Sequence, residues 1–243
     1  MHDVWVLRHG ESTANAAGLI VSVPGPRALT EVGLTALGRE QARTAAERAA
    51  EQGLGAGTLV LTSDFARARE TAEEFTSVLG AQPPRLDHRL RERSFGIYDE
   101  GPTRAYESVW AADRERGPYE GEVEPVTAVA RRVLEVLREA DEIARDAPVV
   151  LVAHGDVLQI TLALSAGTDP HDHRQVPHLG NAELRRIGPG RDLRGTARHR
   201  GADGADTFAG SDGAGIRAGV DGIAVGAAGE GLRASSPEPS GGA

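Results

Sequence analysis

Three short apolar runs, separated by stretches with helical periodicity, organise the chain. The runs are 3–7 (DVWVL), 58–62 (TLVLT) and 148–153 (PVVLVA), and each is rich in β-branched or aliphatic residues. Such runs are typical of strands buried in a sheet that is covered on both faces. A fourth segment, 181–187 (NAELRRI), predicts a strand at the edge of that sheet.

Amphipathic segments lie between these runs. Residues 34–53 carry apolar side chains at helical spacing, Leu37 among them, and a glycine ends the segment. Residues 67–80 end in the same way, and residues 127–145 place a stripe of valine and leucine on one helical face. Strands that alternate with helices in this way predict βαβ units. We therefore expect an α/β fold, a three-layer α/β/α sandwich with a mainly parallel sheet.

The composition changes at Gly188, and this predicts a domain boundary. Of the 31 glycines, 15 fall in the last 56 residues, among alanine, aspartate and serine and without a sustained apolar period. Such a segment has little bulk to bury against the entropy cost of ordering its backbone. We expect one folded domain over residues 1–187 and a disordered tail over 188–243, to which no activity is assigned.

Charge and missing residue types exclude several classes of function. The formal net charge is -9, which argues against a general nucleic-acid binder, since phosphate backbones are held by broad basic surfaces. All 27 basic residues are arginine, so Schiff-base chemistry and a lysine-containing phosphate loop are absent. The chain has no cysteine, which excludes disulfides, thiolate nucleophiles and thiolate-bound zinc.

No segment of the sequence signals export or membrane insertion. The first residues, MHDVWVLRHG, lack a basic stretch followed by a long apolar one, and nowhere do about eighteen apolar residues run together. These features favour a cytoplasmic protein that has no membrane partner. The sequence leaves the oligomeric state open.

Cationic and imidazole side chains stand where the predicted strands end. Arg8 and His9 follow the first strand, Arg67 opens the helix after the second, and His154 with Gly155 follows the strand at 148–153. In open α/β sheets, ligands collect at the carboxyl ends of the strands, where helix N-termini point N–H groups outward. The sequence therefore predicts an anion site at this edge, where Gly155 and Gly10 leave room for the ligand.

Four separated segments resemble the histidine phosphatase superfamily, also called the phosphoglycerate mutase-like family. They are LRHGEST, TSDFARARETAE, LRERSFG and VAHGDVL, and the resemblance runs from residue 3 to about residue 187. It implies a phosphoglycerate mutase-like fold and phosphoryl transfer through a phosphohistidine, with no metal and no cofactor. The expected partner is a small phosphorylated substrate.

The resemblance gives roles to the residues at the strand ends. His9 is the expected nucleophile, while Arg8, Arg67 and His154 surround the phosphoryl group and neutralise its charge. A guanidinium beside His9 disfavours the imidazolium form and so keeps a nitrogen lone pair free for attack. Ser12 and Asn15 can donate further hydrogen bonds from the first helical turn.

A leaving alkoxide needs a proton donor, and Glu92 in RLRERSFG is the candidate. Its position matches the acid of the mutase-like branch of the family. Asp156 is the rival, because the acid-phosphatase branch places an aspartate directly after its second histidine. Here Gly155 intervenes, and Glu92 can also be read as a surface carboxylate paired with Arg91 or Arg93.

Several alternatives stay open at this stage. A mutase needs a further cation, for which Arg93, Arg104, Arg114 or Arg116 are candidates, and the lack of lysine after RERSFG favours hydrolysis instead. A non-catalytic phospholigand-binding protein is a further possibility. Residues 101–124, with aromatic side chains Tyr106, Trp110 and Tyr119, are expected to cap the site or to join the core. The histidines of HDHRQVPH (His171, His173, His178) are interpreted as solvated rather than as metal ligands.

Overall fold

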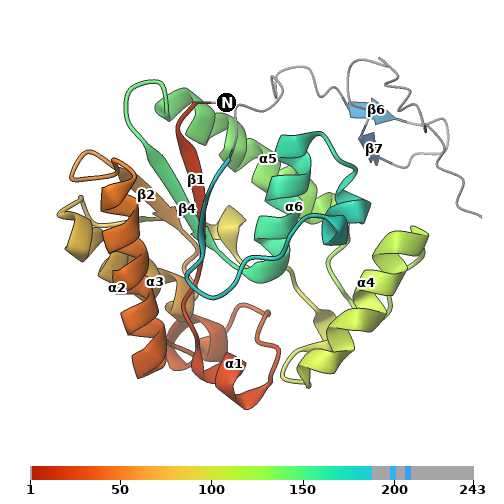
Figure 1. Ribbon diagram of the computed structural model, residues 1–243. Helices are drawn as coiled ribbons and strands as arrows, with labels where there is room; N and C mark the ends of the chain where they lie inside the picture. The colour runs from red at the N-terminus through yellow and green to blue at the C-terminus, as the bar shows by residue number, and fades with distance from the viewer. Residues whose placement is uncertain (1, 188–197, 201–205, 209–243) are drawn as a thin grey trace, which may run out of the picture. The chain divides into compact units, whose positions relative to one another are not determined.

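The computed structural model describes residues 2–187, 198–200 and 206–208. Figure 1 shows the arrangement of its helices and strands. The chain divides into two compact units, residues 1–211 and 212–243, and the second lies outside the described residues. The elements are β1 (Val4–Arg8), α1 (Thr13–Ala17), η1 (Arg27–Glu31), α2 (Ala36–Glu51), β2 (Leu59–Thr62), α3 (Ala66–Leu79), β3 (Arg85–Leu86), η2 (His88–Leu90), η3 (Gly96–Tyr98), η4 (Thr103–Ala105), α4 (Tyr106–Glu115), α5 (Val126–Ile143), β4 (Val149–Ala153), α6 (Gly155–Ala166), η5 (Pro170–Gln175), β5 (Leu184–Arg186), β6 (Arg198–Arg200) and β7 (Asp206–Phe208).

Five strands form the central sheet in the order β3-β2-β4-β1-β5. The neighbouring pairs from β3 to β1 are parallel, and β5 runs antiparallel to β1. The three strands predicted from apolar runs form as β1, β2 and β4, each within one residue of its expected limits. The predicted edge strand forms as the shorter segment β5. The two-residue strand β3 follows a Pro-Pro pair, and the apolar pattern did not indicate it.

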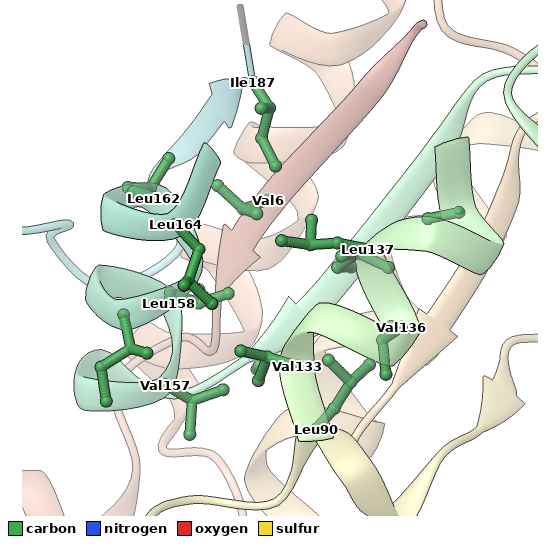
Figure 2. Packing of buried hydrophobic residues seen from close by; sticks show 14 of the residues in the cluster. Val6, Leu90, Val133, Val136, Leu137, Val157, Leu158, Leu162, Leu164 and Ile187 are labelled. Carbon is green, nitrogen blue, oxygen red and sulfur yellow. The ribbon is translucent and has the colours of Figure 1, made fainter. Parts of the chain in front are cut away.

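Helices cover both faces of this sheet, so the expected three-layer α/β/α architecture is confirmed (Figure 1). Alternate residues of β1 and β4 point to opposite faces, as the pleat of a strand requires. One set packs with α5 and α6, and the other packs with α2 and α3. Figure 2 shows the first of these interfaces, where Val6 of β1 lies among Val133 and Leu137 of α5 and Leu158 of α6.

The helix α2 differs from its sequence prediction in one respect. Its buried stripe consists of small residues, Gly38 and four alanines, whereas Leu37 is 54% exposed. Small side chains allow α2 to approach its neighbours closely, and a leucine one position away points off the stripe. The expectation that Leu37 lies in the core is wrong.

Part of the tail predicted for residues 188–243 belongs to the described residues. Two short strands, β6 and β7, pair antiparallel there, with Arg198 opposite Phe208. The remaining residues of the predicted tail lie outside the described residues.

Candidate active site

The pairing of β1 with β4 brings two histidines together. Arg8, the last residue of β1, is in register with Ala153, the last residue of β4. The next residues, His9 and His154, therefore leave the sheet side by side, and their ring centroids lie 5.2 Å apart. Because the strands are parallel, both side chains reach the carboxyl edge of the sheet.

Arg67 reaches the same point from the next strand along the sheet. It is the second residue of α3, which begins just after β2. Its Nε donates a hydrogen bond to Nε2 of His9 at 3.2 Å, and its Nη2 donates to the carbonyl of Val21 at 2.9 Å. The side chain is buried, so this guanidinium is held in place from two sides.

The hydrogen bonds of His9 fix which of its ring nitrogens carries the proton. Nδ1 lies 2.8 Å from the carbonyl oxygen of Gly10, which can only accept, so Nδ1 is the protonated nitrogen. Nε2 then presents a lone pair to Arg67. Burial, with the charges of Arg67 and Arg8, holds the pKa of His9 well below its usual range. The imidazole is therefore neutral and its Nε2 is a base or nucleophile.

Three buried nitrogen atoms around His9 have no hydrogen-bond partner among the described residues. They are Nε of Arg8, Nη1 of Arg67 and Nδ1 of His154. Buried polar groups in proteins are nearly always paired, so a cluster of unpaired nitrogens is a candidate place for a ligand. The chemistry of the two guanidinium groups suits an oxyanion such as phosphate.

Each of these side chains is anchored at its other nitrogens. Nη1 of Arg8 donates to the carbonyl of Leu179 at 2.7 Å and lies 2.8 Å from Nε2 of His178. Nε2 of His154 lies 2.9 Å from the hydroxyl of Ser63. That hydroxyl oxygen also accepts from the backbone N–H of Phe65, so the Ser63 side chain is held in place beside His154.

A cavity of about 210 Å³ opens above these groups. Seven of the eight residues predicted for the site line it, and His154 lies buried behind His9. The seven are Arg8, His9, Ser12, Asn15, Arg67, Glu92 and Gly155.

Ser12 and Asn15 form the first turn of α1. The Ser12 side chain caps the helix by accepting from the Asn15 N–H, and the Asn15 side-chain oxygen accepts from the Ser12 N–H and hydroxyl. The same oxygen accepts from Nδ2 of Asn181. The capping box therefore occupies the Ser12 hydroxyl, while the amide nitrogen of Asn15 stays available to the cavity.

The two glycines of the site differ in role. A Cβ on Gly155 would lie in ordinary contact with the guanidinium of Arg8, which agrees with its place in the cavity wall. A Cβ on Gly10 would lie 2.3 Å from the carbonyl oxygen of Gly38. Gly10 is therefore needed for the close approach of α2, and the expectation that it leaves room for the ligand is wrong.

Glu92 is a buried carboxyl group in the cavity wall. One of its oxygens accepts from the backbone N–H of Arg93 at 2.9 Å. Burial, together with the charge of Asp156, raises its pKa to about 7, against the opposing effect of Arg67. A carboxyl group with this pKa carries a proton for much of the time near neutral pH and can donate it. The alternative of a paired surface carboxylate is wrong, since Arg91 pairs with Asp64 instead.

Asp156 lies close by in the opposite protonation state. Burial alone would raise its pKa, but hydrogen bonds from His173 and Trp110 and the charge of Arg93 hold it well below its ordinary value. Trp110 donates to it at 2.8 Å and Arg93 at 3.2 Å. Asp156 is therefore an ionised anchor rather than a proton donor.

The segment 101–124 contributes one helix, α4, to the cavity. Tyr106 and Trp110 line it, with their rings stacked at 5.3 Å. Tyr119 does not line it; its hydroxyl donates to Asp113 at 2.6 Å. Two of the three aromatic residues, Tyr106 and Trp110, thus lie at the cavity as expected. Tyr119 instead packs against α4 away from the cavity.

The four arginines considered as an additional substrate cation lie elsewhere. Arg93 is fully buried and forms ion pairs with Asp113 and Asp156. Arg114 pairs with Glu107, Arg116 pairs with Asp169, and Arg104 is exposed on η4. The cavity is lined, besides Arg8 and Arg67, by a further cation, Arg174 of η5, which no periodicity or motif indicated.

The histidines of residues 171–178 have separate partners. His171 contacts Asp169, the buried His173 contacts Asp156, and His178 lies against Arg8 in the cavity wall. The expectation of a solvated loop is wrong for His173, which is fully buried. Among the described residues, no group of three or more histidine, aspartate or glutamate side chains is arranged to hold a metal ion.

Within the described part of the chain, no helix combines the length and the apolar composition that crossing a bilayer requires.

Comparison with known proteins shows which family this chain resembles. The family profile of the histidine phosphatase superfamily (branch 1) matches residues 4–199. A probable phosphoglycerate mutase, GpmB, of Yersinia enterocolitica is 30% identical over 193 residues, which cover 77% of this chain and 85% of that protein. The corresponding protein of Serratia proteamaculans is 29% identical with the same coverage.

Solved structures of mycobacterial enzymes share the fold. One described as mycobacterial hydrolase 1 has a TM-score of 0.64 at 27% identity and covers 80% of this chain and 94% of its own. A mycobacterial glucosyl-3-phosphoglycerate phosphatase in complex with VO3 has a TM-score of 0.62 at 27% identity, with coverages of 76% and 91%.

Proposed function

Because this chain belongs to the histidine phosphatase superfamily, we propose that it hydrolyses phosphate monoesters through a phosphohistidine at His9, with Glu92 as proton donor and without a metal ion. The observation that carries the proposal is the ring of unpaired buried nitrogens on Arg8, Arg67 and His154 around a neutral His9. These groups match the oxygens of a phosphoryl group and leave the nucleophile unprotonated.

In the first step, the Nε2 lone pair of His9 forms a bond to phosphorus while the bond from phosphorus to the ester oxygen breaks. Arg8, Arg67 and His154 donate to the non-bridging oxygens and stabilise their charge in the transition state. Nδ1 of His9 keeps its proton and donates it in a hydrogen bond to the carbonyl of Gly10, so the ring stays oriented. Glu92 gives its proton to the departing alkoxide, which leaves as an alcohol.

In the second step, water attacks the phosphohistidine. The Glu92 carboxylate accepts a proton from this water, the bond from phosphorus to nitrogen breaks, and inorganic phosphate leaves. Glu92 is protonated again and His9 is neutral, so the cycle closes with one ester and one water consumed. A pKa of about 7 allows Glu92 to serve as acid and then as base.

Release of phosphate from p-nitrophenyl phosphate in the presence of a chelator tests the proposal. We expect wild type to be active, His9→Ala to be inactive, and His88→Ala, whose histidine side chain is 70% exposed, to be unaffected. Rapid quenching with a phosphate-labelled substrate should trap label on wild type that is stable in base, lost in acid and absent from His9→Ala. Inactive wild type that still binds phosphate would favour the non-catalytic phospholigand-binding alternative instead.

Phosphoglycerate mutase activity is the second candidate, and one observation favours it. Arg174 supplies a further cation in the cavity, of the kind that retention of a bisphosphorylated intermediate needs. The probable mutases among the relatives agree with this alternative. Incubation with 3-phosphoglycerate and 2,3-bisphosphoglycerate separates the two, because a phosphatase releases inorganic phosphate whereas a mutase forms 2-phosphoglycerate.

A further inference from the structure

The outer wall of the cavity, formed by Tyr106, Trp110 and Arg174, is a stack of two aromatic rings and a guanidinium. Tyr106 and Trp110 stack with an interplanar angle of 12°. The guanidinium carbon of Arg174 lies 3.7 Å from the centre of the Trp110 ring. Trp110 is held by its hydrogen bond to Asp156, so the platform on which Arg174 rests is fixed. A guanidinium on an aromatic face is oriented and partly desolvated.

Arg174 differs from its neighbouring arginines in its partners. Arg114 and Arg116, close to it, each form an ion pair with a carboxylate. Arg174 has no ion pair within the described part of the chain, and its one hydrogen bond runs from Nη1 to the side-chain oxygen of Gln159. Its Nε and Nη2 have no partner among the same residues, so one forked edge of the guanidinium is unpaired. Such an edge fits two oxygens of a carboxylate or phosphate.

The position of Arg174 separates it from the phosphoryl site. Arg8 and Arg67 are close enough to Glu92 for its charge to raise their pKa values against the larger, lowering effect of burial. For Arg174 burial again lowers the pKa first, and the acidic neighbours are Asp156 and Glu107. Arg174 thus lines the same cavity from η5, with other charged neighbours than Arg8 and Arg67 have.

The residues that line the cavity offer a substrate leaving group a route toward Arg174. The phosphoryl oxygens face Arg8, Arg67 and His154, and the ester oxygen faces Glu92. Tyr106 and Glu92 both line the cavity, and burial with the charge of Glu92 raises the pKa of Tyr106. From Tyr106 the stack continues through Trp110 to Arg174. The alcohol part of the substrate thus passes along the outer wall toward the unpaired fork.

We propose that Arg174 determines specificity by binding a second anionic group on the leaving-group side, so that the preferred substrates are phosphate monoesters whose alcohol part carries a carboxylate or a second phosphate. This inference rests on the proposed function for its catalytic consequence. The binding of the second anionic group depends only on the guanidinium of Arg174, which is stacked on Trp110 and has an unpaired edge.

Matched substrates of equal shape test the proposal. The pair is 4-carboxyphenyl phosphate and 4-carbamoylphenyl phosphate, with 3-phosphoglycerate and glycerol 3-phosphate as a shorter pair. Phosphate release gives kcat/KM for each. In wild type we expect the carboxylate member to be favoured by about tenfold or more in at least one pair, since charge-assisted hydrogen bonds are about twice as strong as neutral ones.

Substitution of Arg174 should remove this preference. Arg174→Gln should lower kcat/KM for the carboxylate member by about tenfold and change the neutral member by less than about threefold. Arg174→Lys should recover part of the preference. Arg104→Gln, which removes an exposed arginine outside the cavity, should leave the preference unchanged. Arg174→Met keeps an apolar side chain packed on Trp110, and it replaces Arg174→Gln in this test if the glutamine variant does not fold.

Calorimetric titration of His9→Ala with the same substrates separates this inference from the proposed hydrolysis. Tighter binding of the carboxylate member, lost in His9→Ala/Arg174→Gln, supports the anion site even if wild type turns over none of the substrates. In that case only the proposed hydrolysis fails. A preference that survives both Arg174→Gln and Arg174→Met, or an equal loss for both members of each pair, overturns the inference.

Discussion

The floor of the cavity (Arg8, His9 and Arg67, together with the buried His154 beside His9) and its outer wall are built in different ways. Three of the four floor residues stand where a strand ends, and the fourth opens a helix directly after a strand. The outer wall comes from α4 and η5, which touch through the stacking of Arg174 on Trp110. The floor is set by the sheet itself, whereas the outer wall depends on contacts between side chains far apart in the sequence. We therefore expect substitutions in the floor to reduce the rate of the chemical step, and substitutions in the outer wall to change the preference between substrates.

Among variants that keep His9, the largest effect should come from Glu92→Gln, which removes the proton donor beside the floor. On glycerol 3-phosphate, whose alkoxide needs a proton, kcat should fall by about 10³-fold. On p-nitrophenyl phosphate, whose leaving group needs none, the loss should be less than about tenfold for the same step. Stopped assays of both substrates give the comparison, and an equal loss on both would contradict the role of Glu92 as an acid.

The same residue predicts a pH dependence. Glu92 donates only while protonated, so wild-type kcat/KM on glycerol 3-phosphate should fall as the pH rises through about 7. Below that pH Glu92 is protonated, and its titration no longer changes kcat/KM. Glu92→Gln should lack the fall.

The anchor of the outer wall gives the next effect. Asp113 of α4 binds the fully buried Arg93 through two hydrogen bonds, of 2.7 and 2.9 Å. Asp113→Asn removes one of the negative charges that compensate the buried Arg93 guanidinium. The substitution should therefore lower the free energy of unfolding by about 3 kcal/mol. Urea unfolding measures this loss. Unchanged stability would show that α4 is not held by this pair.

Gly10→Ala tests how closely α2 supports the floor. The added methyl group would meet the Gly38 carbonyl at 2.3 Å, and we expect a loss of about 2 kcal/mol from overpacking. Activity should fall on all substrates alike, because His9 shifts with Gly10. Gly25→Ala is the matched control, since a Cβ there meets nothing within 4 Å. Equal stability of the two variants would refute the close approach.

The smallest effect is expected on the outer surface of α4. Glu107 pairs with Arg114 at 2.8 Å, and both side chains are about half exposed or more. Exposed ion pairs contribute little, so Glu107→Gln should change the free energy of unfolding by no more than about 0.5 kcal/mol. Thermal and urea unfolding check this expectation, and a change as large as that of Asp113→Asn would remove the contrast between the two faces of α4.

The same contrast explains what the sequence could predict. Arg8, His9 and His154 each follow an apolar run, and parallel strands must place such residues at one edge, so local pattern was sufficient for the floor. The stack of Arg174 on Trp110 depends on how η5 packs against α4, and this contact joins segments about 60 residues apart that no local pattern relates to each other. The burial of His173 against Asp156 is likewise a tertiary contact.

Two wrong expectations have similar causes. Leu37 shares the general helical spacing of α2, but the buried stripe consists of glycine and alanine, and only the approach of the neighbouring helices selects it. Gly10 was read from its place in a motif, whereas its contact is with Gly38, in a separate helix. A glycine in a sequence can indicate that a Cβ would not fit, but only the structure identifies the neighbouring atoms that a Cβ would meet.

The ends of the central sheet bear on how the protein behaves at high concentration. At one side stands β3, with two residues, and at the other β5, with the sequence LRR. A strand this short offers an incoming chain few free N–H and C=O groups, and arginine charges repel a second copy of the same edge. Self-association by strand addition is therefore disfavoured, even though the strands between these edges are among the most aggregation-prone segments of the chain when unfolded.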